Sequence, residues 1–97
     1  MPAFIVATVK ITDAERFQLY AQGIAGLSER HGGEAVVKGP VAETLEGDCV
    51  DGERVVVTRF PTADQARGYI RSAEYQAAAQ HRIGSAEVTM RLLVVPD

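Results

Sequence analysis

The chain has 97 residues, enough for one domain spanning 1–97 with a single modest core. Its formal net charge of −3 disfavours nucleic acid or an anionic membrane surface as a partner. The single Cys49 cannot form an internal disulfide, and no run approaches the roughly 20 apolar residues that span a bilayer. No targeting segment is visible either, so we expect a cytoplasmic protein.

The first third of the chain predicts a strand followed by a helix. Residues 3–10 are rich in β-branched side chains, which is typical of a strand. Thr12 and Glu15 then match a capping box, which marks the start of a helix. Residues at the spacing of one buried helix face follow, and Gly32-Gly33 ends the helix with one glycine in the left-handed conformation. The residues of this face are Phe17, Tyr20, Ala21, Ile24, Leu27 and His31.

The middle of the chain predicts a hairpin. Residues 34–39 have the composition of a second strand, Gly39-Pro40 interrupts it, and 41–46 is a candidate continuation. Asp51-Gly52 is the strongest turn signal in this segment. Residues 54–60, with three consecutive valines, form the third strand.

A second helix and a last strand complete the pattern. Residues 62–65 repeat the capping-box arrangement, and a second apolar helix face follows. Residues 72–74 mark a break, after which helical turns continue over 75–82 until Gly84-Ser85. Residues 87–95 form the fourth strand. The second helix face consists of Ala66, Tyr69, Ile70 and Ala73.

A faint internal repeat at an offset of 50 residues connects the two halves. Thr8 aligns with Thr58 near the strand ends, and Thr12 aligns with Thr62 at the two helix starts. Two β-α-β units in tandem give β-α-β-β-α-β, the ferredoxin-like order. Right-handed crossovers then place both helices on one face of a four-stranded antiparallel sheet. The sequence therefore predicts an α+β fold.

Three of the expected strands are apolar on both faces, although two helices cover only one face. Residues 3–9, 54–60 and 88–95 lack the apolar–polar alternation of a sheet with one wet face. Four strands of six residues leave about 400 Å² uncovered, and monomers seldom expose so large an apolar patch. We therefore expect a homodimer that packs sheet face to sheet face.

Several short motifs in this order are similar to a known family. They are Tyr20-Ala21, His31-Gly32-Gly33, Leu45-Glu46-Gly47-Asp48, Phe60-Pro61, Ser72-Ala73-Glu74-Tyr75-Gln76-Ala77-Ala78 and Arg82. The chain resembles domain-of-unknown-function family 1330, part of the dimeric α+β-barrel superfamily. The resemblance covers nearly the whole chain and implies the fold and the dimer, whereas it implies no defined activity.

The wider superfamily places its pockets between the sheet and the helices, which gives a candidate site here. We expect this pocket to bind a small organic ligand without a cofactor. The alternative is a cofactor-independent enzyme, of the monooxygenase or isomerase type, acting on a small organic acid or aromatic. A ligand-sensing regulatory domain shares the same strand order. The polar residues placed to reach the pocket are Tyr20, His31, Thr58, Tyr75 and Arg82.

Each of these residues also has a purely structural interpretation. Tyr20 lies on an apolar stripe and fits a core aromatic whose hydroxyl has one partner. His31 follows a helix and fits a C-terminal cap. Arg82 fits either an ion pair with a carboxylate such as Glu46 or an anchor for a carboxylate ligand.

Other kinds of site find no support in the sequence. The acidic segment from Glu43 to Glu53 lacks the spacing of a calcium loop, and one cysteine with two histidines makes no recognised zinc pattern. Cys49 has no evident base beside it that would make it a nucleophile. RNA-recognition modules of this strand order need exposed aromatics, and strand 54–60 offers only Phe60. We expect neither a metal nor a nucleic acid.

Overall fold

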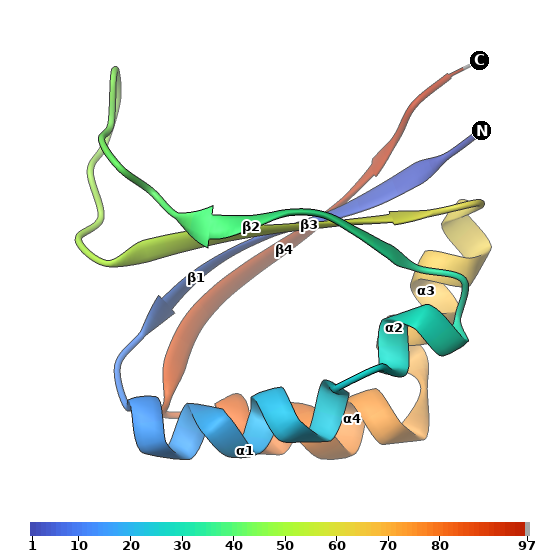
Figure 1. Cartoon of the computed structure of the whole chain (residues 1–97), viewed down its shortest axis with the longest axis horizontal. Coiled ribbons are helices and arrows are strands. Elements are labelled where there is room, and N and C mark those ends of the chain that lie inside the picture. The colour runs from blue at the N-terminus through green and yellow to red at the C-terminus, as the bar shows by residue number, and fades with distance from the viewer. Residues whose placement is uncertain (97) are drawn as a thin grey trace.

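In the computed structural model, which describes residues 1–96, a four-stranded antiparallel sheet carries helices on one face (Figure 1). The strand order is β2-β3-β1-β4, so the predicted ferredoxin-like β-α-β-β-α-β topology is confirmed. The elements in chain order are β1 (Ala3–Ile11), α1 (Ala14–Ile24), α2 (Leu27–Arg30), β2 (Glu34–Pro40), β3 (Glu53–Phe60), α3 (Ala63–Arg71), α4 (Ala73–Ala79), the 3-10 turn η1 (Gln80–Arg82) and β4 (Ala86–Val94).

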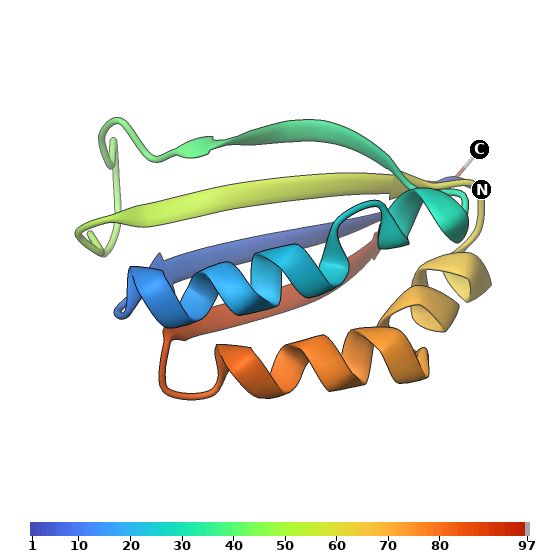
Figure 2. The ribbon, with the colours of Figure 1, turned by 60° about the horizontal axis from the view of Figure 1, so that its bottom comes forward.

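The helices form a single layer beneath the sheet, with α1 and α4 side by side (Figure 2). Gly23 of α1 allows this close approach, because a Cβ at that position would lie 2.8 Å from the Cβ of Ala78 in α4. Within residues 1–96, no helix combines the length and apolar character that a bilayer crossing requires.

The register divides the sheet into a helix-facing side and an open face. Ala3, Ile5, Ala7 and Val9 of β1 are buried toward the helices. The residues between them in β1 point the other way, and directly paired residues of β3 and β4 share their side. The paired residues form four rows across the open face, each with one residue from β3, one from β1 and one from β4, in that order. Along the sheet, these rows are Glu53–Lys10–Glu87, Val55–Thr8–Thr89, Val57–Val6–Arg91 and Arg59–Phe4–Leu93.

The open face is therefore less uniformly apolar than the strand composition indicates. Phe4, Val6 and Val57 form an apolar centre that is only half-buried in the single chain. By their pairing, Arg59 and Arg91 also belong to this face, and Arg91, on the edge strand β4, borders the space between the sheet and α3 as well. The uncovered surface that motivates a dimer exists, but polar and charged side chains flank it.

The caps of the two helices agree with the predicted helix starts to within one residue. Asp13, rather than Thr12, caps α1, and its carboxylate accepts a hydrogen bond from the Arg16 amide at 3.1 Å. The Thr12 amide instead donates to the Ser85 carbonyl at 2.9 Å. The Thr62 cap of α3 is confirmed, since its hydroxyl accepts from the Gln65 amide at 3.2 Å.

The first helix ends earlier than its apolar periodicity predicts. Gly26 adopts a positive φ of 72°, which stops α1 and turns the chain into the short helix α2. The turn lets Leu27 become fully buried. His31 is the C-terminal cap of α2, and Gly32 follows with a φ of 86°, the left-handed glycine expected there.

The segment between β2 and β3 differs most from the sequence prediction. The candidate continuation over 41–46 is wrong, because residues 41–52 form an exposed irregular loop. The last backbone bond before the loop runs from the Val41 amide to the Glu53 carbonyl at 2.9 Å. The predicted turn at Asp51-Gly52 is present, with Gly52 at a φ of 75°. The loop extends beyond the sheet (Figures 1 and 2).

Candidate functional site

A cavity of about 360 Å³ lies between the helix-facing side of the sheet and the helices α1 and α3. Its volume is at the lower end of the range of small-molecule sites. Most of its wall is aliphatic or aromatic, and polar side chains enter it at four positions, Tyr20, Lys38, Thr58 and Tyr69. The apolar lining residues are Ile5, Ala7, Val9, Phe17, Ala21, Ile24, Ala25, Val56, Ile70, Val88 and Met90.

A second, smaller cavity of about 230 Å³ adjoins the first. The two share Ile5, Ile70 and Met90, so these side chains stand between them. The smaller cavity lies between α3 and the β4 edge of the sheet. Its remaining lining residues are Ala66, Arg67, Arg71, Arg91 and Leu92.

A hydrogen-bonded group adjoins the larger cavity and consists of Tyr20, Tyr75 and Arg82. Of these three residues, only Tyr20 lines the cavity itself. The Arg82 guanidinium donates to the Tyr75 hydroxyl at 2.6 Å, and the Tyr20 and Tyr75 hydroxyls are 3.0 Å apart. The Tyr75 hydroxyl is also 3.4 Å from the sulfur of Met90, to which it can donate. The guanidinium carbon lies 5.3 Å from the ring centre of Tyr20, at cation–π distance.

The chemistry of the donors constrains where the phenolic protons of this group lie. A guanidinium only donates, so the Tyr75 oxygen accepts from Arg82 and keeps one proton for Tyr20 or for Met90. When Tyr75 donates to Tyr20, the Tyr20 proton is free for an acceptor in the cavity. Burial, and then the hydrogen bond to Tyr75, raise the pKa of Tyr20 above its ordinary value. Tyr20 is therefore a neutral hydrogen-bond donor at physiological pH.

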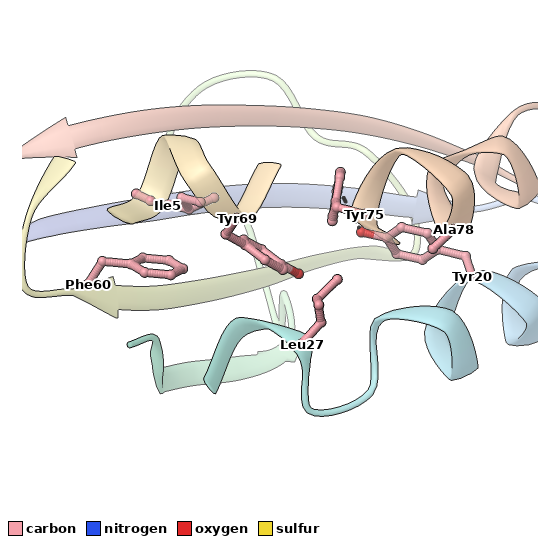
Figure 3. Packing of buried hydrophobic residues seen from close by; sticks show 8 residues of the cluster. Ile5, Tyr20, Leu27, Phe60, Tyr69, Tyr75 and Ala78 are labelled. Atoms are coloured by element: carbon pink, nitrogen blue, oxygen red, sulfur yellow. Dashed lines mark hydrogen bonds between the residues drawn. The ribbon is translucent and has the colours of Figure 1, made fainter. Parts of the chain in front are cut away.

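Tyr69 brings a second phenol to the cavity. The residue is only 8% exposed, and its hydroxyl makes no hydrogen bond to residues 1–96. Burial raises its pKa to about 12. Its ring stacks on Phe60 at 5.7 Å and meets Tyr75 edge-on at 5.0 Å. Figure 3 shows Tyr69 and Tyr20 pointing toward one another from α3 and α1.

The structure brings together most of the residues that the sequence nominates. Tyr20, Tyr75 and Arg82 are in direct contact, and Thr58 lines the cavity from β3. His31 does not line the cavity, although its ring lies 5.9 Å from that of Tyr69.

Arg82 does not form the ion pair with Glu46 that the sequence analysis considered. Glu46 lies in the exposed loop 41–52, and within the described chain Arg82 bonds to a phenol instead of a carboxylate. Arg82 is also absent from the lining of both cavities. Its place is behind Tyr20, where it orients the phenols.

The sequence-based set lacks two polar residues of the cavity, Tyr69 and Lys38, and also Met90, which the Tyr75 hydroxyl contacts. Tyr69 is on the predicted helix face, but periodicity alone does not distinguish a core ring from one that opens onto a cavity. Lys38 and Met90 lie on strands whose register the sequence leaves open.

The described residues contain no group of three or more His, Cys, Asp or Glu side chains that could hold a metal ion.

Comparison with protein families identifies the chain. The model of the family described as Domain of unknown function (DUF1330) matches residues 2–96. The chain belongs to this family. No curated protein matches it.

Solved structures similar to this DUF1330 protein show the same fold. The RPA0582 protein of unknown function from Rhodopseudomonas palustris superposes with a TM-score of 0.79 at 22% identity, covering 98% of this chain and 84% of that one. A dimeric ferredoxin-like protein of unknown function from Jannaschia sp. CCS1 gives 0.73 at 13% identity, covering 98% and 100%. SnoaB, a cofactor-independent oxygenase from Streptomyces nogalater, gives 0.68 at 15% identity, covering 99% and 94%.

Proposed function

We propose that this DUF1330 protein is a homodimer that binds a small organic ligand in the larger cavity, between the sheet and the helices. The observation that carries the proposal is an apolar chamber with a buried phenol, Tyr69, whose hydroxyl has no partner among residues 1–96. Within residues 1–96 no fully buried side-chain oxygen or nitrogen lacks a partner, so the unpaired Tyr69 hydroxyl opens onto the chamber, where a ligand oxygen can accept its hydrogen bond. Tyr20 offers a second proton to the same chamber when Tyr75 donates to it.

The homodimer part of the proposal rests on the open face of the sheet. The apolar centre around Phe4, Val6 and Val57 lies on the side opposite the helices, so pairing two sheets would leave the cavity untouched. The similar protein from Jannaschia is described as a dimeric ferredoxin-like protein. Apolar patches of this kind in single chains usually serve as interfaces.

A titration with naphthyl methyl ketone tests ligand binding. This neutral probe has an apolar ring system for the chamber and a carbonyl that accepts from a phenol. We expect saturable chemical-shift changes for Tyr20, Tyr69 and the Met90 methyl group. Ala21→Trp places a bulky ring at an exposed position of the cavity lining and should abolish the shifts while the fold persists.

Leu19→Trp is the matched control for this titration. Leu19 is on the same helix and 48% exposed, but it does not line the cavity, so the added indole should leave binding unchanged. Shifts that do not saturate, or saturable binding that survives Ala21→Trp, would show that this cavity is not a ligand site.

A cofactor-independent enzyme is the second candidate function. The Tyr20–Tyr75–Arg82 group favours it, because a phenol backed by a cation can stabilise negative charge that develops on a substrate oxygen. The oxygenase SnoaB has a similar fold. For an enzyme, Tyr20→Phe should lower kcat more than it changes KM, whereas for a binding protein the substitution changes only affinity.

A further inference from the structure

The charged side chains that line the cavities are of one sign. The chain as a whole has 13 acidic and 10 basic residues, yet neither cavity is lined by any aspartate or glutamate within the described chain. Among residues 1–96, Lys38 is the single charged residue that lines the larger cavity. The proposed ligand site therefore favours a negatively charged or neutral occupant over a cation.

A β-bulge places Lys38 on the helix-facing side of the sheet. The register of β2 against β3 shifts between Ala35 and Val37, so that Val36 is an extra residue. Ala35 pairs with Thr58 and Lys38 pairs with Val56, both of which line the cavity. Without the extra residue, strict alternation from Ala35 would turn Lys38 to the open face.

The ammonium group of Lys38 is available to a ligand. Lys38 is exposed at the β2 side of the cavity, and it makes no side-chain hydrogen bond or ion pair with residues 1–96. Of the other cations near the two cavities, Arg71 and Arg91 line the smaller one, and the remaining two already have partners. Arg82 is bound to Tyr75, and Arg67 pairs with Asp64 at 3.1 Å beside the smaller cavity.

We infer that the ligand of this cavity is an organic anion whose apolar body fills the chamber and whose carboxylate pairs with Lys38. The inference rests on the proposed ligand-binding function and specifies its ligand class. Tyr69 and Tyr20 then provide hydrogen bonds to an oxygen deeper in the chamber. The cation selects among apolar molecules of similar shape, because a carboxylate forms an ion pair with the ammonium group that a neutral group cannot form.

The inference is tested with two probes that share a ring system, naphthoate and naphthyl methyl ketone. The affinity of each is measured by calorimetry for the wild-type protein and for Lys38→Met. We expect naphthoate to bind the wild type more tightly than the ketone, and Lys38→Met to weaken naphthoate about fivefold to tenfold. The ketone affinity should remain unchanged, and Lys38→Arg should retain most of the naphthoate affinity.

Two further variants make the test specific. Arg30→Met removes an exposed cation of α2 that lines neither cavity, and it should leave naphthoate binding unchanged. Arg71→Met removes one of the two cations of the smaller cavity, Arg71 and Arg91, that have no ion-pair partner in residues 1–96. A loss of naphthoate affinity in Arg71→Met but not in Lys38→Met would overturn the assignment to Lys38.

The two probes also separate this inference from the function on which it rests. If neither probe binds the wild type, the proposed ligand-binding function fails. If the ketone binds and naphthoate binds no more tightly, or if Lys38→Met leaves naphthoate unaffected, the cavity is a ligand site but the anion inference is wrong.

Discussion

Gly23 lies against Ala78 where α1 packs on α4, and it provides a direct stability test. A Cβ added there would lie 2.8 Å from the Cβ of Ala78, closer than packed carbon atoms allow. Overpacking of this kind costs about 1–3 kcal/mol, which exceeds the roughly 1 kcal/mol that alanine gains over glycine in a helix. We therefore expect Gly23→Ala to lower the free energy of unfolding, measured by urea denaturation at fixed protein concentration.

Gly68 is the matched control for Gly23. It is also a helical glycine, in α3, but the nearest atom to an added Cβ is Nδ1 of His31, 4.0 Å away. Gly68→Ala should therefore raise the free energy of unfolding by about 1 kcal/mol. Equal effects of the two substitutions would mean that α1 and α4 are not held at this separation.

Because Tyr20 and Tyr69 are buried, we expect the protein to lose stability in alkali. The pKa of Tyr69 is about 12 in the folded protein against an ordinary value of 10.0, and the pKa of Tyr20 is also raised. Between these values the folded state holds a proton that the unfolded state has lost. The contribution of the protonated Tyr69 to the free energy of unfolding is therefore complete below pH 10 and is lost as the pH rises through about 12.

Thermal unfolding as a function of pH checks this expectation. The Tm of the wild type should fall steeply above pH 10, and Tyr69→Phe should make the fall shallower because one of the shifted groups is gone. Tyrosinate absorbance recorded in the same experiment reports the ionisation itself. Parallel curves for the two proteins would indicate that the Tyr69 hydroxyl is solvated in the folded state.

Sequence spacing identified part of the site because helical periodicity fixes which residues share a face. Tyr20 lies on the predicted stripe of α1, and Tyr75 and Arg82 are seven residues apart, which brings them to the same side of the chain. The hydrogen bond between Tyr20 and Tyr75 joins residues 55 positions apart. Such a contact depends on how two helices pack, and no local pattern encodes it.

At the scale of elements, Ser72 joins α3 to α4 and thereby sets the positions of two phenols. Its hydroxyl accepts from the Tyr75 amide at 3.1 Å and donates to the Tyr69 carbonyl at 2.7 Å. Loss of an N-cap costs about 1 kcal/mol. We expect Ser72→Ala to destabilise the protein by that amount and also to weaken binding of naphthyl methyl ketone, as measured by calorimetry.

Thr62→Ala separates the two effects of the Ser72 substitution. Thr62 caps α3 through the Gln65 amide, at the end of the helix away from Ser72. Its loss should cost a similar free energy of unfolding and leave the ketone affinity unchanged. If Ser72→Ala behaves in the same way, the junction of α3 and α4 does not position the phenols.

The order of the elements could be predicted, whereas details of strand register could not. Strand and helix periodicities, with the offset of 50 residues, led to the ferredoxin-like topology. The bulge at Val36 decides the side to which Lys38 points, and adjacent valines give no sign of it. The predicted strand over 41–46 is wrong, because its valine and threonine favour a strand but this segment is not part of the sheet.

For the whole molecule, the open face of the sheet predicts the state of assembly. Val57 stands beside Val6 at the apolar centre of that face. An aspartate buried there between two copies replaces an apolar contact with a carboxylate that must lose its hydration, at a cost of several kcal/mol even with Arg59 and Arg91 on the same face. Val57→Asp should therefore weaken dimerisation by at least about a hundredfold, as measured by light scattering over a dilution series.

Ile83→Asp serves as the control for the assembly test. Ile83 is 64% exposed and follows η1, on the helix side of the molecule, so the same charge there should leave the dimer intact. A wild-type protein that scatters as a single chain at micromolar concentration would contradict the homodimer. Dissociation in both variants would point to a general loss of folding.

The two ends of the chain lie side by side, where the Val95 amide donates to the Pro2 carbonyl at 3.0 Å (Figure 1). Each half of the molecule is a β-α-β unit, and the loop 41–52 is the exposed connection between them. A short linker could join residue 96 to residue 1, and a cut at Gly47 would then exchange the order of the halves while keeping every strand neighbour. The architecture is thus compatible with circular permutation, and the covalent order of the halves is separable from their arrangement in space.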